Sequence, residues 1–393
     1  MEPRNDHVGK LSPRGLGMGV ALLVMSALGA VGCKGDSASS GPTPGAVGSG
    51  GTTSASGGGD VALNGSGSTF VNPILSKWVS EYQAKNKTKI NYQPVGSGAG
   101  IKAITDKTVD FGATDAPMND DQLAKAGGKI LHIPLTLGAV VVTYNLKDAP
   151  PKLQLTPEVL AGIFSGEIKT WNDPKILAVN AGAKLPAQSI GVVYRSDGSG
   201  TTAVFTDYLS KVSPTWKAKV GQGTSVKWLT GTGANKNDGV ANQIKQTPGA
   251  IGYVELAFAR QTKQPVALLK NKAGKFVEPT LEGTTAAAAG LATKLPDDMR
   301  VSLTDADGEG AYPIAAFTYA LVYEDTPSFD KGQALAKFLW WGIHDGQKLG
   351  PALDYAPLPT EVVTKAEAKL KSLKSGGKVL LTDVADTTGA GGK

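Results

Sequence analysis

The segment Ile190–Val212, IGVVYRSDGSGTTAVFTDYLSKV, holds the pattern that decides the fold. Its first residues, Ile190–Arg195, are mostly β-branched or aromatic and predict a strand. A turn rich in glycine and hydroxyl side chains follows at Asp197–Thr202, and a helical pattern runs from Ser199 to about Val212. A strand that leads through a short polar turn into a helix is the repeating unit of α/β proteins, so the segment predicts that fold class.

Two earlier segments repeat this order. In the first, the apolar Val61–Leu63 is followed by the turn Gly65–Phe70 and then by a helical pattern. In the second, the alternating Lys89–Val95 is followed by the turn Gly96–Gly100 and by a helix that begins at Ile101–Thr105. The recurrence predicts largely parallel sheets. Further expected elements are a strand at Val109–Ala113 and helices at Thr156–Phe164, Phe329–His344 and Pro359–Leu373.

Two long apolar stretches, Lys129–Asn145 and Tyr312–Tyr323, lie far apart in the sequence. A protein with two lobes and a two-stranded hinge needs two such crossings. We therefore expect a discontinuous first lobe, made of residues 61–138 and 315–385, and a second lobe made of residues 139–314.

Residues 1–32 have the features of an export signal. Basic residues precede the uncharged apolar run Leu16–Val31, which is shorter than the roughly 20 residues that a membrane-spanning helix needs. The segment Leu28–Cys33, LGAVGC, resembles the bacterial lipobox, in which a lipidated cysteine follows the cleavage site. We expect a lipid on Cys33, a disordered Gly- and Ser-rich linker at residues 33–60, and an exported protein anchored to a membrane, in the periplasm or at the cell surface. An ordinary secretory signal with a free cysteine is the alternative.

The composition excludes several classes of function. Lys and Arg outnumber Asp and Glu by 40 to 34, an excess too small and too scattered for a surface that binds nucleic acid. A single cysteine allows neither a disulfide framework nor a thiolate metal site, and we expect no cofactor and no metal. Asp305–Glu309 has some residues of a calcium-binding loop but lacks its full ligand spacing, so it predicts a polar turn.

The three Gly- and Ser-rich turns have the composition of an oxyanion site. Glycine lets the backbone approach a ligand, N–H groups at a helix start point toward an anion, and hydroxyls add donors. Arg195 offers a planar guanidinium to a tetrahedral oxyanion, and Asp197 is placed to orient it. Each turn alone is more typical of a plain helix cap, and Arg195 with Asp197 could be a surface ion pair. Three such turns at strand ends favour an anion site.

Asp115 narrows the class of anion. A carboxylate repels an anion unless that anion carries a proton that it can donate. Phosphate carries one at neutral pH, whereas sulfate is fully ionised and would leave the carboxylate without a partner. Asp115 therefore favours phosphate, although it could equally cap a helix or a turn.

From Leu63 to about Val363 the chain resembles the periplasmic phosphate-binding proteins of high-affinity phosphate ABC importers. The resemblance rests on five motifs. They are Ser68-Thr69-Phe70, VDFGATDAP at Val109–Pro117, IFSGEIKTW at Ile163–Trp171, DGSGT at Asp197–Thr201 and GAIGYVE at Gly249–Glu255. The resemblance implies a type II periplasmic-binding-protein fold, whose two lobes close over the ligand.

The resemblance also implies which residues hold phosphate. Asp115 would accept the phosphate proton, and Arg195 would supply positive charge. The other implied contacts come from the three turns: Thr69 and Phe70 (through its backbone N–H), Ser97, and Ser199, Gly200 and Thr201. The implied partners are inorganic phosphate and the permease subunits of an ABC importer. We expect a monomer that binds no nucleic acid and is not an enzyme.

Three other functions are compatible with parts of this pattern. A secreted phosphatase could use Ser199 or Asp115 as nucleophile, but only His132 and His344 follow the export signal, and neither a zinc-peptidase motif nor a nucleophile elbow is present. A binding protein for sulfate, molybdate or arsenate would share the fold, and Asp115 argues against all but arsenate. A surface adhesin or phosphate sensor would share the site and differ in its partner.

Overall fold

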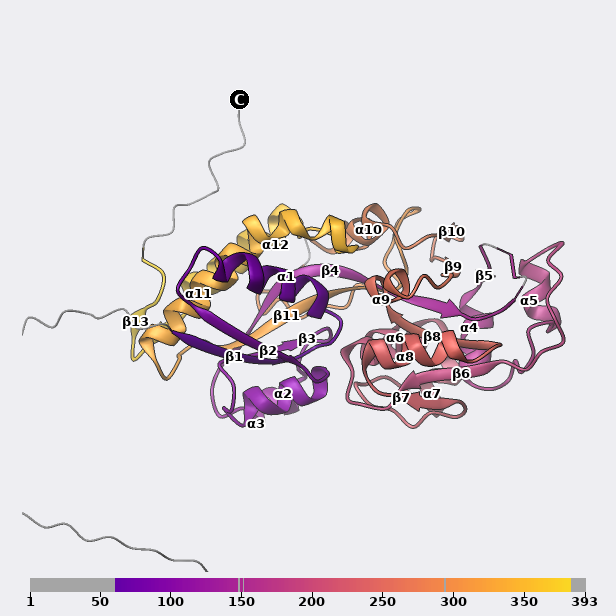
Figure 1. Cartoon of the computed structure of the whole chain (residues 1–393), viewed down its shortest axis with the longest axis horizontal. Coiled ribbons are helices and arrows are strands. Elements are labelled where there is room, and N and C mark those ends of the chain that lie inside the picture. The colour runs from indigo at the N-terminus through magenta and orange to yellow at the C-terminus, as the bar shows by residue number, and fades with distance from the viewer. Residues whose placement is uncertain (1–60, 148, 151, 293–294, 383–393) are drawn as a thin grey trace, which may run out of the picture. The chain divides into compact units, whose positions relative to one another are not determined.

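The described residues form a mixed α/β structure with two lobes (Figure 1). The structure, a computed structural model, describes residues 61–147, 149–150, 152–292 and 295–382. The predicted signal peptide (residues 1–32), Cys33 and the predicted linker (33–60) lie outside the described residues, as do residues 383–385 of the predicted first lobe. Within the described ranges, no helix is both long and apolar enough to span a membrane.

One sheet of eight strands runs through both lobes. Its strands are β1 (Ala62–Gly67), β2 (Lys89–Pro94), β3 (Phe111–Thr114), β4 (Ile130–Tyr144), β6 (Gly191–Arg195), β7 (Thr232–Ala234), β8 (Ala250–Glu255) and β11 (Ala315–Tyr323). The strand order is β2-β1-β3-β11-β4-β8-β6-β7. The predicted parallel pairing is confirmed at both ends, for β1 with β2 and β3 and for β6 with β7 and β8. The centre differs, because β11 and β4 run antiparallel to their neighbours.

The two long apolar stretches expected at Lys129–Asn145 and Tyr312–Tyr323 contain strands β4 and β11. β4 is buried along its whole length; it pairs with β11 up to Ala139 and with β8 from Val140 onward. The first half-sheet is β2, β1, β3, β11 and the part of β4 that pairs with β11, and the second half-sheet is the rest of β4 with β8, β6 and β7. Each lobe is built on one half-sheet. Next to the crossing of β4, the N–H of Val140 donates to the carbonyl oxygen of Ile314 (2.8 Å), just before β11.

Helices cover the sheet, and Figure 1 shows α1, α11 and α12 on one side of β1–β3 with α2 and α3 on the other. The helices are α1 (Asn72–Gln83), α2 (Ser97–Thr105), α3 (Asp120–Lys125), α4 (Pro157–Phe164), α5 (Pro174–Val179), α6 (Gly200–Val212), α7 (Pro214–Lys219), α8 (Lys236–Gln246), α9 (Leu256–Gln261), α10 (Leu281–Ala292), α11 (Phe329–Ile343) and α12 (Thr360–Lys371). The caps follow from the sequence: the Thr156 hydroxyl accepts from the N–H of Val159 at the start of α4, and the Ser199 hydroxyl accepts from the N–H of Thr202 at the start of α6.

Two of the predicted turns are partly wrong. Gly65–Gly67 is not a turn but the end of β1, where it pairs with β2 and β3. Glycine is needed there because a Cβ at Gly65 would lie 2.1 Å from the ring of Phe111. The second turn ends early, because α2 begins at Ser97 and not at Ile101. The early start brings Gly100 against β1, where its Cβ would lie 2.4 Å from the Cα of Gly67.

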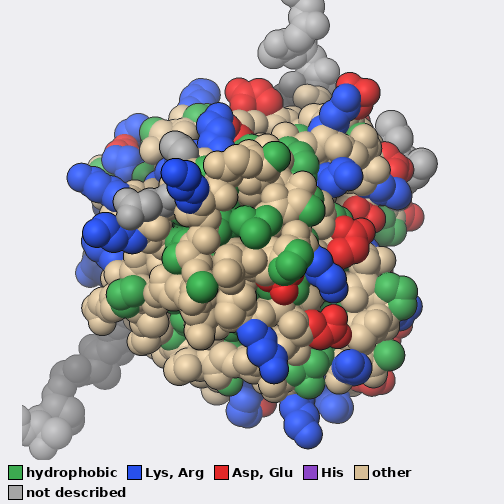
Figure 2. Space-filling view, turned by 90° about the vertical axis from the view of Figure 1, so that its right-hand side faces the viewer, with side chains coloured by type: hydrophobic (Ala, Val, Ile, Leu, Met, Phe, Trp, Pro, Cys, Tyr) green, Lys and Arg blue, Asp and Glu red, His purple; other side chains and the backbone are tan. Residues whose placement is uncertain are grey.

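The remaining strands form small peripheral sheets: β5 (Gln154–Leu155), β9 (Leu268–Lys270) and β10 (Phe276–Val277) in one, and β12 (Lys374–Ser375) and β13 (Lys378–Val379) in the other. Asp305–Glu309 consists of turns and bends, as predicted. Among the described residues, no cluster of His, Cys, Asp or Glu is suited to a metal ion. Figure 2 shows Lys and Arg side chains at several separate places on one face of the molecule, with Asp and Glu among them.

Candidate functional site

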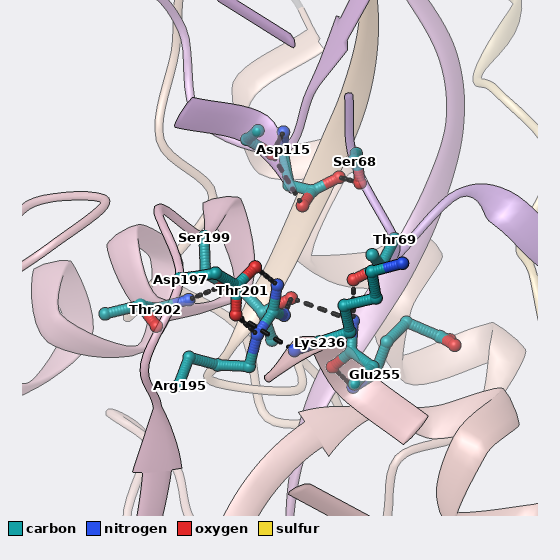
Figure 3. Close-up of polar contacts among 12 residues, drawn as sticks. Ser68, Thr69, Asp115, Arg195, Asp197, Ser199, Thr201, Thr202, Lys236 and Glu255 are labelled. Carbon is teal, nitrogen blue, oxygen red and sulfur yellow. Dashed lines mark hydrogen bonds and ion pairs between the residues drawn. The ribbon is translucent and has the colours of Figure 1, made fainter. Parts of the chain in front are cut away.

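The ends of β1, β3 and β6 and the starts of α1, α2 and α6 converge where the two lobes meet. In Figure 3, Ser68, Thr69 and Asp115 of the first lobe lie near Arg195 and Thr201 of the second. All the predicted ligand residues are in this region and are buried, and the predicted orienting residue Asp197 is partly buried. The buried residues are Thr69, Phe70, Ser97, Asp115, Arg195, Ser199, Gly200 and Thr201.

Glycines allow the turns of the two lobes to touch. The N–H of Gly98 donates to the carbonyl oxygen of Gly198 over 2.9 Å. Gly200, the first residue of α6, faces the first lobe so closely that a Cβ there would lie 2.4 Å from both Asp115 Oδ2 and Ser97 Oγ. Any side chain at position 200 would collide with the Asp115 carboxylate and the Ser97 hydroxyl, so the contact between the lobes requires glycine there.

Asp115 lies at the end of β3 with hydroxyl donors around its carboxylate. Oδ1 accepts from Ser68 Oγ (2.5 Å) and Thr318 Oγ1 (2.9 Å), and Oδ2 accepts from Ser97 Oγ (3.3 Å). Thr318 comes from the middle of β11, on the neighbouring strand of the first half-sheet. The carboxylate is therefore held in one orientation by three elements, and a helix or turn cap is not its role: its side chain accepts no backbone N–H in the described contacts.

Burial raises the pKa of the Asp115 carboxyl to about 6, although the hydroxyls of Ser68, Thr318 and Ser97 and the charge of Arg195 act in the opposite direction. Removing a carboxylate from water disfavours its charged form more than these neighbours favour it. Asp115 can therefore gain or lose a proton near neutral pH, which suits a group that shares a proton with a ligand.

Arg195 and Asp197 form a buried pair at the end of β6. Arg195 Nε donates to Asp197 Oδ1 (2.7 Å) and Nη2 donates to Oδ2 (2.5 Å), and the two side chains are 1% and 11% exposed. The N–H of Lys236 adds a third donor to Oδ1 (2.9 Å). Burial raises the pKa of Asp197, but the hydrogen bonds and charge of Arg195 outweigh it, so this pKa lies below its usual value. The alternative of a surface ion pair is thus wrong, and the guanidinium is fixed in the plane of the carboxylate.

Thr69 and Thr201 present hydroxyls from opposite lobes. Thr201, in the first turn of α6, accepts from Arg195 Nη1 (3.4 Å) and from Asn237 Nδ2 (3.2 Å). Thr69, between β1 and α1, accepts from the same Asn237 amide (2.9 Å). The carbonyl oxygen of Phe70 accepts from Tyr355 Oη (2.5 Å), which fixes the backbone of this turn. The site thus collects hydroxyls, helix N-termini and one arginine around a carboxyl group.

Several residues of the site were not predicted. Ser68 and Thr318 hold Asp115, and Asn237 joins Thr69 and Thr201. Tyr253 Oη forms a hydrogen bond with Thr202 Oγ1, and the N–H of Glu255 donates to Asn237 Oδ1. Ser68 lies in a Gly- and Ser-rich stretch, and Tyr253 and Glu255 lie in the GAIGYVE motif, but neither Thr318 nor Asn237 had a signal in the sequence. These two come from segments up to 203 residues away in sequence, and pairing of strands and helices, which no local pattern specifies, brings them in.

The chain is similar in sequence to known binding proteins. Residues 49–341 match the PBP superfamily domain. A protein of Xylella fastidiosa named phosphate-binding protein PstS is 44% identical over 316 residues, which are 80% of this chain and 86% of that protein. The protein of the same name from Pasteurella multocida is 44% identical over 321 residues, 81% of this chain and 93% of that one.

A solved structure shares the fold. The phosphate-binding protein from Stenotrophomonas maltophilia superposes with a TM-score of 0.60 at 21% identity, covering 78% of this chain and 93% of that one. This likeness shows the two-lobed α/β architecture. The two PstS proteins are 44% identical to this chain and are therefore nearer to it in sequence than this structure is. The chain therefore belongs to the PBP superfamily and, within it, to the PstS family of phosphate-binding proteins.

Proposed function

We propose that this chain captures inorganic phosphate between its two lobes and delivers it to the permease of an ABC importer. The observation that carries the proposal is Asp115, a buried carboxyl set among donors at the junction of the lobes. Hydroxyls, helix starts and Arg195 attract an oxyanion, and Asp115 selects one that carries a proton. The names of the PstS relatives support the ligand, and a structural neighbour from Vibrio cholerae, which is an ABC-type phosphate transport receptor, supports the partner.

In this proposal the ligand residues act as two groups. Thr69, the N–H of Phe70 and Ser97 would bind phosphate from the first lobe, and Arg195, with Ser199, Gly200 and Thr201 at the start of α6, would bind it from the second. Asp115 would accept the phosphate proton, and Asp197 would hold Arg195 in place. Because Asp197 already balances the charge of Arg195, the site carries little net positive charge. The choice of phosphate over other anions would therefore depend on pairing each donor and acceptor of the site with a phosphate oxygen or proton, more than on the total charge of the site.

A catalytic role is less well supported. The Ser199 hydroxyl accepts the N–H of Thr202 as a helix cap, so it is not arranged as a nucleophile with a base. Burial lowers the pKa of His132 to about 4, and its Nε2 accepts the N–H of Met118 in the first lobe, so it is held neutral by the fold. The relatives are likewise named as binding proteins.

We further propose that the lobes divide as residues 61–138 with 315–385 and residues 139–314. The change of pairing partner along β4 between Ala139 and Val140 supports this boundary. A cleft of about 440 Å³ adjoins Asp115 and is lined by residues of both parts, among them Gln122 and Asp207. Such a cleft would let phosphate reach the site when the lobes move apart. We expect the chain to act as a monomer.

Export and anchoring complete the proposal. The signal peptide at residues 1–32 would direct the protein out of the cytoplasm. A lipid on Cys33 would then attach it to a membrane through the Gly- and Ser-rich linker. Mass spectrometry of the mature N-terminus would find a lipidated cysteine, and Cys33→Ser would release the protein from membranes. An unmodified N-terminus at another residue would contradict the anchor and leave the ligand proposal standing.

Isothermal titration calorimetry with phosphate and with sulfate tests the main proposal. We expect phosphate to bind at micromolar or tighter affinity, because a site with many buried polar contacts and full enclosure reaches that range. Sulfate should bind far more weakly at neutral pH. Equal binding of the two anions, or turnover of a phosphate ester, would overturn it.

A further inference from the structure

Asn237, the second residue of α8, is completely buried and joins the two lobes. Its Nδ2 donates to Thr69 Oγ1 (2.9 Å) in the first lobe and to Thr201 Oγ1 (3.2 Å) in the second. Its Oδ1 accepts the N–H of Glu255 (3.1 Å), at the end of β8. One side chain therefore contacts both hydroxyls that are expected to hold the ligand from opposite sides.

The orientation of this amide is fixed by its surroundings. The backbone N–H of Glu255 can only donate, so it must face the amide oxygen of Asn237. The amide NH₂ group must then face the hydroxyls of Thr69 and Thr201, and it has one hydrogen for each of them. A flipped amide would place the NH₂ group of Asn237 against the N–H of Glu255, two donors facing each other, and would place the amide oxygen against the hydroxyls of Thr69 and Thr201.

This orientation decides what the two hydroxyls can do. A threonine hydroxyl has one hydrogen to donate and two lone pairs that accept. Both lone pairs of Thr201 are used, by Asn237 and by Arg195 Nη1 (3.4 Å), so its hydrogen must point to another acceptor. Thr69 also accepts from Asn237, which directs its hydrogen away from the amide. Both hydroxyls are left as donors, which is what an anion requires.

We propose that Asn237 is a positioning residue of the phosphate site: it holds Thr69 and Thr201 as donors toward the ligand, and its bond to Thr69 forms only when the lobes are together. The inference rests on the proposed function. Asn237 does not need to touch phosphate for this role. It acts through the two threonines and makes their alignment part of lobe closure.

Asn237→Asp is the sharpest test, because it keeps the size and the acceptor for Glu255 but replaces the donor by a carboxylate. The carboxylate would accept the hydrogens of Thr69 and Thr201 and turn them away from phosphate. We expect the Kd for phosphate, measured by calorimetry at pH 8, to rise at least about tenfold. The loss should shrink as the pH falls and the introduced carboxyl regains a donor, relative to the unmodified protein at each pH. Asn237→Ala serves if the first variant does not fold, with the same rise expected.

The matched control is Asn180→Asp. Asn180 is also a buried amide that binds donor and acceptor groups, those of Gln154 and Ile176, but it lies at the end of α5, away from the site. Its variant should lose thermal stability and keep its phosphate affinity. A double-mutant cycle adds Thr69→Val, which should cost less in the Asn237→Asp background than alone.

The outcomes separate the two ideas. If the unmodified protein does not bind phosphate, the proposed function fails. If it binds and Asn237→Asp binds equally well, or shows the same loss at every pH, or is additive with Thr69→Val, the positioning role of Asn237 is wrong. A loss of affinity in Asn180→Asp as large as in Asn237→Asp would also overturn it, because the effect would then be one of general stability.

Discussion

The backbone N–H of Gly98, at the start of α2, donates a 2.9 Å hydrogen bond to the carbonyl oxygen of Gly198, in the turn before α6. A Cβ on Gly98 would lie 3.0 Å from the Cα of Gly198, and its three nearest neighbours all belong to that residue. We predict that Gly98→Ala separates the two turns and weakens phosphate binding by about 1 kcal/mol or more, or at least about fivefold in Kd. Calorimetry gives the affinity.

The free protein should keep its melting temperature in this variant, since the added methyl group meets only the opposite lobe. Gly310→Ala is the control, because a Cβ there has no neighbour within 4 Å among the described residues. Unchanged affinity in Gly98→Ala would mean that the contact between the turns is not part of the ligand-bound form.

Asp115 should make the preference for phosphate over sulfate depend on pH. Its pKa is raised to about 6, chiefly by burial. Above that pH the carboxylate can only accept, so it disfavours sulfate; below it the carboxyl carries its own proton and can donate to sulfate. The preference should therefore be largest above pH 7 and should fall as the pH drops through about 6. Titrations with both anions between pH 5 and 8 measure it.

Asp115→Asn isolates the same group. Its amide donates at every pH, so we expect the sulfate Kd to fall, the phosphate Kd to rise, and the ratio between them to change at least about tenfold at pH 8. The variant should also lose the pH dependence of the ratio. A ratio that stays constant with pH in the unmodified protein would show that Asp115 does not distinguish an anion that carries a proton from one that does not.

The elements of the site that are local in sequence could be predicted, and those that depend on tertiary pairing could not. Thr156 and Ser199 mark the predicted starts of two helices, and in the structure both are caps, because a hydroxyl before a helix can accept the N–H three residues on. Gly65–Gly67 was assigned to a turn because glycine is rare inside strands. It is a strand because it pairs with β2 and β3, and glycine occupies positions 65 and 67 because Phe111 and Ala113 lie too close for a side chain there.

The same limit applies to the groups around the ligand residues. Thr318 lies in a buried apolar strand, where a single threonine has no local signal of function, and pairing of β11 with β3 brings it to Asp115. Asn237 follows a short strand that was not predicted. Arg195 and Asp197 were found because two residues of opposite charge lie beside a turn that already suggested an anion.

Breaking the buried pair of Arg195 and Asp197 should cost much more than breaking a similar exposed pair. Asp197→Asn would leave the guanidinium, which is 1% exposed, without its carboxylate. We expect a loss of about 3–5 kcal/mol in the free energy of unfolding, measured by urea denaturation without phosphate. Asp298→Asn is the control, since Asp298 pairs with Arg300 two residues away but is 50% exposed, and should cost no more than about 1 kcal/mol. Equal losses would mean that the fold does not depend on the buried charge.

Glu255 should make the protein less stable as the pH rises. Its side chain is buried, Oε2 accepts from the N–H of Ala257 (2.9 Å) and lies 3.2 Å from Tyr355 Oη, and Oε1 has no hydrogen-bond partner among the described residues. Burial raises the pKa of this carboxyl well above 4.5, so the folded protein keeps its proton when the unfolded chain has lost it. Folding then takes up a proton, and the free energy of unfolding falls with pH by up to about 1.4 kcal/mol per unit.

Glu255→Gln removes this titration and keeps the shape of a neutral carboxyl. Its stability relative to the unmodified protein should therefore grow in urea denaturation as the pH rises above the ordinary range of a glutamate, while the contribution of Asp115 cancels because both proteins have it. Glu309→Gln, the same loss of charge at an exposed position, is the control. If the difference between Glu255→Gln and the unmodified protein is the same at every pH, Glu255 is ionised in the folded protein, and a charged group must then approach Oε1 from outside the described contacts.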